Sequence, residues 1–139
     1  MTYLPDTDVL SELRRPTPSP SVLDWFDATR PTELYLSVMV VGEIRQGVER
    51  LRSRDPGRSA RHEAWLHQLQ ESFVDRILQI TMPIAEAWGR LRAAGPVPVV
   101  DSLLAATALV HGLTVVTRDT EPFERIGVPY LDPWTYGEP

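Results

Sequence analysis

The sequence predicts one α/β domain over residues 1–139, built on a mainly parallel sheet of four or five short strands flanked by helices. The length of 139 residues fits a single domain. Short apolar segments rich in β-branched residues alternate along the chain with segments of helical periodicity. That alternation is typical of a sheet whose parallel strands are joined by crossover helices. No internal repeat or low-complexity tract divides the chain, so we expect no second domain.

Five segments of the chain are predicted to form the strands. Residues 3–5 are a short apolar start, and residues 34–37 (Leu-Tyr-Leu-Ser) follow as the second strand. Residues 77–80 are expected to form the third. Residues 113–117 give the clearest strand signal, because they are few, apolar and largely β-branched. Residues 129–131 are predicted to be a last edge strand, where a proline is tolerated.

Helices are predicted between these strands. Asp6 is placed to cap a helix that carries Val9 and Leu10, and the proline-rich loop 16–20 ends that helix. The strongest helical signal is an apolar stripe at spacings of three and four residues, formed by Val41, Ile44, Val48 and Leu51. Further helices are expected around residues 22–26, 65–73, 83–91 and 99–110. The last is apolar and rich in alanine, so we expect a buried helix that Gly112 ends.

Composition excludes several classes of chemistry. The chain has no Cys and no Lys, which removes disulfides, thiol catalysis, Cys-ligated metals and any mechanism that needs a catalytic Lys. Its net charge of -5 argues against broad electrostatic binding of nucleic acid, although all 14 basic residues are Arg and six of them fall between positions 45 and 61. No apolar run could span a bilayer and no signal peptide is visible, so we expect a cytoplasmic protein without a membrane partner.

Four acidic residues follow the predicted strands. Asp6 comes after the first strand, Glu43 lies early in the helix after the second, Asp101 is in the first turn of the apolar helix, and Asp119 lies two residues beyond the fourth strand. Ligands of open α/β sheets bind beyond the carboxyl ends of the strands, so these acids should gather there. Each one alone could equally cap a helix or sit in a polar turn. Glu43 and Asp101 carry more weight, because carboxylates in mostly apolar helices are usually paired or bound to a metal.

Four carboxylates in one cleft repel each other unless a cation compensates them. Oxygen ligands alone suit a hard ion such as Mg²⁺ or Mn²⁺. Such an ion can activate a bound water and stabilise the charge that builds on phosphorus. The pattern therefore points to hydrolysis of a phosphodiester or a phosphomonoester.

Four segments carry a resemblance to a known family. Residues 3–13 (Tyr-Leu-Pro-Asp-Thr-Asp-Val-Leu-Ser-Glu-Leu), 42–48 (Gly-Glu-Ile-Arg-Gln-Gly-Val), 100–108 (Val-Asp-Ser-Leu-Leu-Ala-Ala-Thr-Ala) and 114–119 (Thr-Val-Val-Thr-Arg-Asp) contain the four acids. In order and spacing they resemble the motifs of PIN-domain ribonucleases, in particular VapC-type toxins of VapBC toxin–antitoxin pairs, including the FitB-like branch. The resemblance covers nearly the whole chain and implies a single PIN-like domain.

The resemblance also implies a function. Asp6, Glu43, Asp101 and Asp119 would be the catalytic, metal-binding residues of a Mg²⁺- or Mn²⁺-dependent endoribonuclease that hydrolyses RNA by a metal-activated water, and Thr117 would assist the last acid. The expected partners are the RNA substrate, often a structured RNA, and a cognate VapB-type antitoxin that covers the site. A homodimer and a larger toxin–antitoxin assembly are implied as well.

Several positions near the motifs stay open. The family usually has Asn where this chain has Asp8, which adds a charge of uncertain role, and Pro5 replaces an aliphatic residue and removes a backbone donor. Arg45 and Arg118 lie within two residues of a site acid. They are candidates either for contact with RNA phosphate or for neutralising the site.

Three other interpretations fit part of the sequence. In a haloacid-dehalogenase-like phosphatase, Asp6 would be the nucleophile and Asp8 the general acid and base, but the chain lacks the expected Lys and a second late acid. A receiver-like signalling domain would need a Lys near the last strand. A catalytically inactive interaction domain on the same fold is opposed by the complete set of acids.

Overall fold

The computed structural model describes all residues 1–139 and contains five short strands, all of them parallel. The strands are β1 (Tyr3–Pro5), β2 (Leu36–Ser37), β3 (Ile77–Leu78), β4 (Thr114–Val116) and β5 (Tyr130–Leu131). They form a three-stranded sheet in the order β1-β4-β5 and a two-stranded pair β2-β3. The predicted α/β class and the edge position of the last strand are confirmed.

The single continuous sheet expected from the sequence is instead divided in two. One parallel bridge between Tyr3 and Leu34 joins the parts, supported by the bond that the Tyr35 amide donates to the Tyr3 carbonyl oxygen at 2.9 Å. The ladder stops there because β2 is only two residues long and passes at Val38 directly into a helix. The two parts still run in the same direction, so the ends of β1, β2 and β4 face one region.

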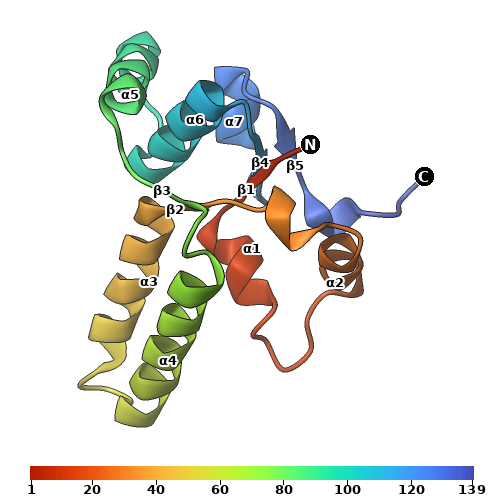
Figure 1. The fold of residues 1–139 in the computed structure, drawn as a ribbon, viewed down its shortest axis with the longest axis vertical. Coiled ribbons are helices and arrows are strands. Elements are labelled where there is room, and N and C mark those ends of the chain that lie inside the picture. Colours follow the sequence, from red (N-terminus) through yellow and green to blue (C-terminus); the bar gives the residue numbers. More distant parts are fainter.

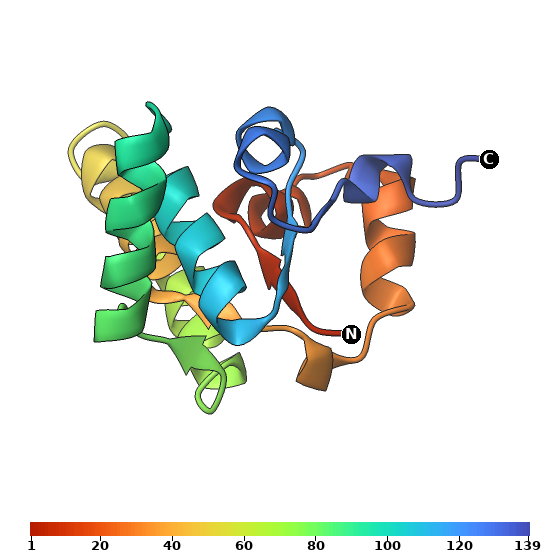
Figure 2. The ribbon, with the colours of Figure 1, turned by 90° about the horizontal axis from the view of Figure 1, so that it is seen from above.

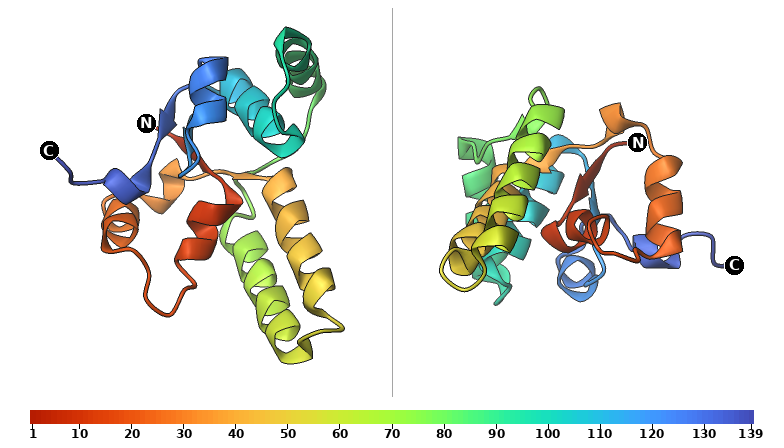
Figure 3. Two further views of the ribbon diagram at one scale, coloured as in Figure 1. Left: turned by 180° about the vertical axis from the view of Figure 1, so that it is seen from behind. Right: turned by 90° about the horizontal axis from the view of Figure 1, so that it is seen from below.

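Seven helices surround the strands (Figure 1). They are α1 (Thr7–Glu12), α2 (Pro20–Asp27), α3 (Val38–Leu51), α4 (Pro56–Ser72), α5 (Met82–Ala94), α6 (Val99–His111) and α7 (Glu121–Ile126), with short 3₁₀ turns at Pro31–Glu33 and Pro133–Thr135. Figure 1 and Figure 3 show α3 and α4 as an antiparallel hairpin that extends from the strands, while α5 packs along α6 on the other side. Seen from above, α2 lies beyond the sheet, opposite α5 (Figure 2). None of the helices is long and apolar enough to cross a membrane.

The short helix α7 is the element that the sequence analysis missed. It has only six residues, too few for an apolar period to be visible. Its signals are a proline at its second position, Pro122, and Gly127 at its end with a φ of 86°. Phe123 anchors it in the core at 1% exposure.

The core lies between the three-stranded sheet and the helices α1, α3 and α6. Leu4, Val115 and Val116 supply the sheet side and are fully buried. The predicted burial of α6 is confirmed, since residues 104–106 and Ala108 are at most 1% exposed. Each fully buried Leu or Val contributes about 1.5–3 kcal/mol relative to an exposed position. Gly112 ends α6 as predicted, in the left-handed conformation with a φ of 68°.

The buried stripe of α3 differs by one position from the prediction. Val40, Ile44 and Val48 face the core, whereas Val41 and Leu51 are only half-buried. The buried residues of α3 recur every four positions, so the face of the helix that packs on the core lies next to Glu43. Glu43 is therefore half-buried at the boundary between the core and the surface.

Candidate active site

Asp6 is fixed by hydrogen bonds to both of its carboxylate oxygens. It directly follows β1, and its own amide donates to the Val116 carbonyl oxygen of β4 at 2.9 Å. Asp6 Oδ1 accepts the amide of Val9 at 3.0 Å, which caps α1 as the sequence predicts. Asp6 Oδ2 accepts the hydroxyl of Thr117 at 2.7 Å. The carboxylate is thus oriented from two elements, a helix and the neighbouring strand.

Thr117 connects two of the predicted site acids. It is fully buried at the end of β4. Its hydroxyl donates to Asp6 and accepts the amide of Asp119 at 3.1 Å. This one oxygen therefore orients a side chain after β1 and the turn that carries the acid after β4.

Glu43 is tied to the first motif by a residue that the sequence analysis did not single out. The hydroxyl of Thr7 donates to Glu43 Oε1 at 2.6 Å and so links α1 to α3. The signal for Thr7 was its place between two acids of the first motif, but only the folded chain shows which carboxylate it contacts. Thr7 thus joins the first motif to the second, as Asp6 joins the first motif to the fourth through Thr117.

Asp101 is half-buried in the first turn of α6, and its carboxylate has no hydrogen-bond or ion-pair partner in the structure. Burial raises the pKa of Asp101. The charges of three further acids raise it as well, namely those of Asp119, Glu43 and Asp8. These acids affect the pKa of Asp101 because their carboxylates lie near its own.

The pKa of Asp6 is affected by neighbouring acids in the same way as the pKa of Asp101. The pKa of Asp6 is raised to about 6 by burial first and by the charges of Asp8 and Asp101, against the lowering effect of the bonds from Thr117 and Val9. All four predicted acids and Asp8 therefore share one region at the carboxyl ends of the strands. No three acidic or His side chains converge closely enough to hold one ion between them.

The two arginines named as RNA contacts have different surroundings. Arg45 forms ion pairs with Glu63 and, at 3.5 Å, with Glu49, so its charge is already compensated. The guanidinium of Arg118 lies over the ring of Trp134, with 4.8 Å between its central carbon and the ring centroid. Arg118 and Asp8 line the same hollow of 250 Å³, which places Arg118 beside the acids.

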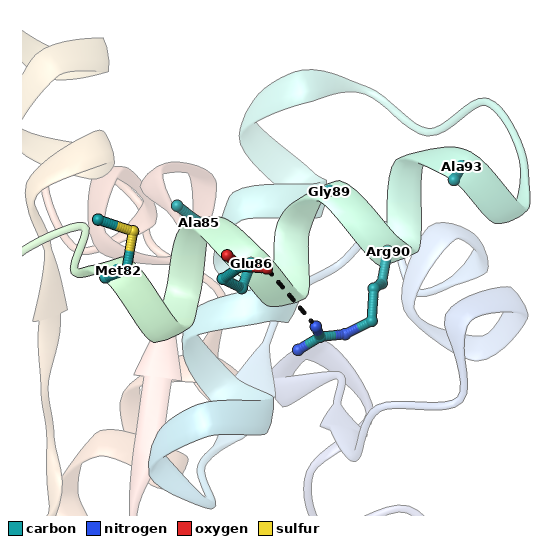
Figure 4. Close-up of a pocket in the computed structure, with 6 residues that line it drawn as sticks. All are labelled: Met82, Ala85, Glu86, Gly89, Arg90 and Ala93. Atoms are coloured by element: carbon teal, nitrogen blue, oxygen red, sulfur yellow. Dashed lines mark ion pairs between the residues drawn. The ribbon is translucent and has the colours of Figure 1, made fainter.

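A separate hollow of 440 Å³ lies along α5 and contains none of the predicted site residues. Its lining consists of Met82, Ala85, Glu86, Gly89, Arg90 and Ala93. Glu86 and Arg90 form an ion pair at 3.8 Å across it (Figure 4). The chemistry expected from the acids therefore does not belong to this hollow.

Acidic side chains beyond the carboxyl ends of parallel strands in an α/β domain are typical of the class of metal-dependent sites that hydrolyse phosphate esters. The family model of the PIN domain matches residues 3–129 of the chain, so the chain belongs to the PIN-domain family. This membership confirms the resemblance seen in the sequence. It excludes the haloacid-dehalogenase and receiver folds as interpretations.

The chain is similar over nearly its whole length to several known proteins. The plasmid stability protein StbB of Pseudomonas syringae pv. tomato is 40% identical over 134 residues, which cover 93% of this chain and 96% of that protein. Toxin FitB of Neisseria gonorrhoeae is 35% identical with the same coverage. The VapC ribonuclease Y4jK of Sinorhizobium fredii is 32% identical, covering 93% of this chain and 95% of that protein. The crystal structure of FitAcB from Neisseria gonorrhoeae matches with a TM-score of 0.86 and 34% identity, over 96% of this chain and 99% of that chain.

Replacing Thr117 by valine tests its role as a positioning residue. The change keeps the buried volume but removes the hydrogen bonds of the hydroxyl to Asp6 and to the backbone of Asp119, so Asp6 and the turn at Asp119 lose their common anchor. We expect RNA cleavage to fall about 10- to 100-fold. Thr107→Val is the matched control, because Thr107 is equally buried and its hydroxyl donates only to the Leu103 carbonyl oxygen. Equal losses in both variants would assign the effect to packing, and unchanged cleavage by Thr117→Val would remove the residue from the site.

Proposed function

We propose that this PIN-domain protein is a metal-dependent endoribonuclease and the toxin of a toxin–antitoxin pair. The observation that carries the proposal is the meeting of four chain segments at one edge of the strands, each contributing a carboxylate. Asp6 follows β1, Asp119 follows β4, and Asp101 lies in the first turn of α6. Glu43 of α3 is held to the first motif by Thr7. The ribonuclease name of the Sinorhizobium relative supports the same activity.

The donor set fits a hard divalent cation. All four candidate ligands are carboxylates, and ionisation of the half-buried Asp6 and Asp101 is disfavoured by burial first and by the charges of neighbouring acids second. Ligands of this kind suit Mg²⁺ or Mn²⁺, which we propose Asp6, Glu43, Asp101 and Asp119 hold. When bound, such an ion supplies an activated water and neutralises charge on the phosphodiester. The chain itself orients Asp6 through Thr117 and Val9, and Glu43 through Thr7.

The biological role follows from the relatives. One is named a toxin and another a plasmid stability protein, names that suit the toxin half of a toxin–antitoxin pair. We therefore propose that a VapB-type antitoxin inhibits this chain by covering the acidic site. We also propose that the protein acts in the cytoplasm as a homodimer, which assembles further with the antitoxin.

Expression of the protein in bacteria tests this proposal. We expect growth arrest with loss of a defined RNA species, because an uninhibited endoribonuclease cuts cellular RNA. Co-expression of a cognate antitoxin, sought as a small reading frame next to the gene, should restore growth, and RNA sequencing of 5′ ends should locate the cut. Normal growth and intact RNA in cells that contain a verified level of folded protein would contradict the toxin role. A cleavage assay with the purified protein would then show whether it is a nuclease.

A further inference from the structure

A strongly basic hollow of 680 Å³ lies beside the acidic site, between the end of α1 and the first turns of α4. No hydrophobic residue lines it. Its lining consists of Ser11, Arg14, Arg15, Pro16, Arg58, Arg61 and His62, and we call it the arginine hollow. Residues 14 and 58 are far apart in the sequence, so only the folded chain brings these charges together.

Three guanidinium groups in the arginine hollow have no acidic partner. Arg14, Arg58 and Arg61 take part in none of the ion pairs of the structure, whereas Arg15 pairs with Glu12 at 3.6 Å. Elsewhere on the α3–α4 hairpin, Arg45 and Arg52 are both neutralised by Glu49 and Glu63. The chain has more acidic than basic residues, 19 against 14, yet no acid forms an ion pair with any of these three arginines.

The cations lie close enough to affect each other. Arg14 contacts the Nδ1 atom of His62, and its central carbon lies 4.7 Å from the ring centroid of Trp65. Burial lowers the pKa of Arg14, and the charges of Arg61 and Arg58 lower it as well. Uncompensated like charges in one hollow disfavour the isolated protein and favour a bound anion.

The arginine hollow is continuous with the acidic site. Ser11 and His62 also line a smaller hollow of 140 Å³ that contains Thr7 and Glu43. On its other side, Ser11 and Arg15 line the hollow that contains Asp8 and Arg118. A polyanion bound at the acidic site that extends past Ser11 therefore reaches the unpaired arginines.

We propose that the arginine hollow is a phosphate-binding subsite that holds the RNA backbone next to the site of cleavage. The identity of the ligand as RNA rests on the proposed function. The fork of the guanidinium group matches phosphate oxygens in a bidentate manner, and all the basic side chains here except His62 are Arg. An acidic protein segment is less suited to this place, because protein interfaces bury apolar side chains at their centre and this hollow offers none.

The effect of the subsite can be measured as binding. The probe is a fluorescein-labelled single-stranded RNA of about 20 nucleotides, followed by anisotropy in buffer with EDTA so that no cleavage occurs. We expect Arg58→Ala and Arg61→Ala each to weaken binding about tenfold, the loss typical of one charge-assisted contact. Each variant should also reduce the slope of log K against log salt by about 0.7, the value for one phosphate of a single strand. Arg14→Ala should act similarly, but it also removes the contact with Trp65, so Arg58 and Arg61 carry the test if that variant unfolds.

Arg54→Ala is the matched control. Arg54 lies in the same charged segment and has no acidic partner, but it is outside the hollow and contacts only the Arg50 carbonyl oxygen. It removes the same charge and should leave affinity and salt slope close to those of the unchanged protein. In cleavage assays Arg61→Ala should raise KM with kcat retained, because the subsite binds RNA without touching the reacting atoms.

The outcomes separate this inference from the proposed function. Wild-type cleavage together with unchanged affinity, salt slope and KM in the Arg58 and Arg61 variants would overturn the subsite and leave the nuclease intact. RNA binding that depends on these arginines without any cleavage would overturn the nuclease and keep the subsite. Binding of polyglutamate but not RNA would overturn the subsite in favour of a surface for an acidic protein.

Discussion

Replacing Asp101 by alanine is expected to abolish RNA cleavage while the protein remains folded. The side chain is half-buried, has no hydrogen-bond partner and lies in the field of Asp119, Glu43 and Asp8. Its carboxylate therefore contributes little to the fold but completes the acid set that would hold the cation. Loss of a partner in the outer shell of a metal site costs about 10- to 100-fold, so loss of a direct ligand should reduce cleavage by at least about 100-fold.

The measurement is the cleavage rate of a labelled RNA beside the circular dichroism spectrum and the melting temperature. We expect a melting temperature equal to or above that of the unchanged protein, because the substitution removes a repelling charge. Asp24→Ala is a suitable control, since Asp24 is an exposed acid in α2 without a side-chain partner. Cleavage retained by a folded Asp101→Ala protein would reject the assignment of the site.

Removing divalent cations is expected to stop cleavage completely, and adding Mg²⁺ or Mn²⁺ should restore it. The carboxylate set offers oxygen ligands only, and its negative charges repel the scissile phosphate unless a cation lies between them. The measurement is the cleavage rate after treatment with EDTA and dialysis, followed by titration with each cation. Full activity in a sample shown to be free of metal would contradict the mechanism.

Thermal stability gives a readout of the cation that does not depend on activity. Burial raises the pKa of Asp6 to about 6 from an ordinary value of 3.8. The folded protein then binds this proton more tightly than the unfolded chain does. In the metal-free protein the free energy of unfolding should therefore fall as the pH rises from about 4 to 6, by up to about 3 kcal/mol from this group.

A bound cation should reverse this loss, because it compensates the ionised carboxylates. We expect Mg²⁺ or Mn²⁺ to raise the melting temperature at about pH 7.5 and to have little effect near pH 4, where Asp6 is protonated. The Asp101→Ala variant should show a smaller rise. An equal rise at both values of pH, or none at either, would contradict binding at these acids.

The elements that the sequence predicted well are those with strong local signals. The cap at Asp6 and the stop of α6 at Gly112 each depend on one residue whose preferred conformation is well known, and strand β1 depends on a short apolar run. The four acids were predicted to meet because parallel strands direct their carboxyl ends to one edge, and the negative field around Asp101 agrees with this.

The features that could not be predicted depend on contacts between distant segments. The division of the sheet follows from the early start of α3, and the partner of Glu43 is a hydroxyl 36 positions away. The arginines near position 45 looked equivalent in the sequence. The packing of α3 against α4 shows that Arg45 is neutralised by Glu63, and the packing of α1 against this hairpin shows that Arg58 and Arg61 line a hollow without a compensating acid.

Helix α1 has a consequence for where an RNA chain would be cut. It has only six residues, which corresponds to a length of about 9 Å. Asp6 caps its beginning and Arg14 follows its end, so the acidic site and the arginine hollow lie at the two ends of one rigid element. If a phosphate binds in the arginine hollow at the end of α1, the length of the helix sets which phosphodiester bond of the RNA lies at the acidic site near Asp6. Lengthening α1 by one residue would shift this register and also rotate the arginine away from its hollow.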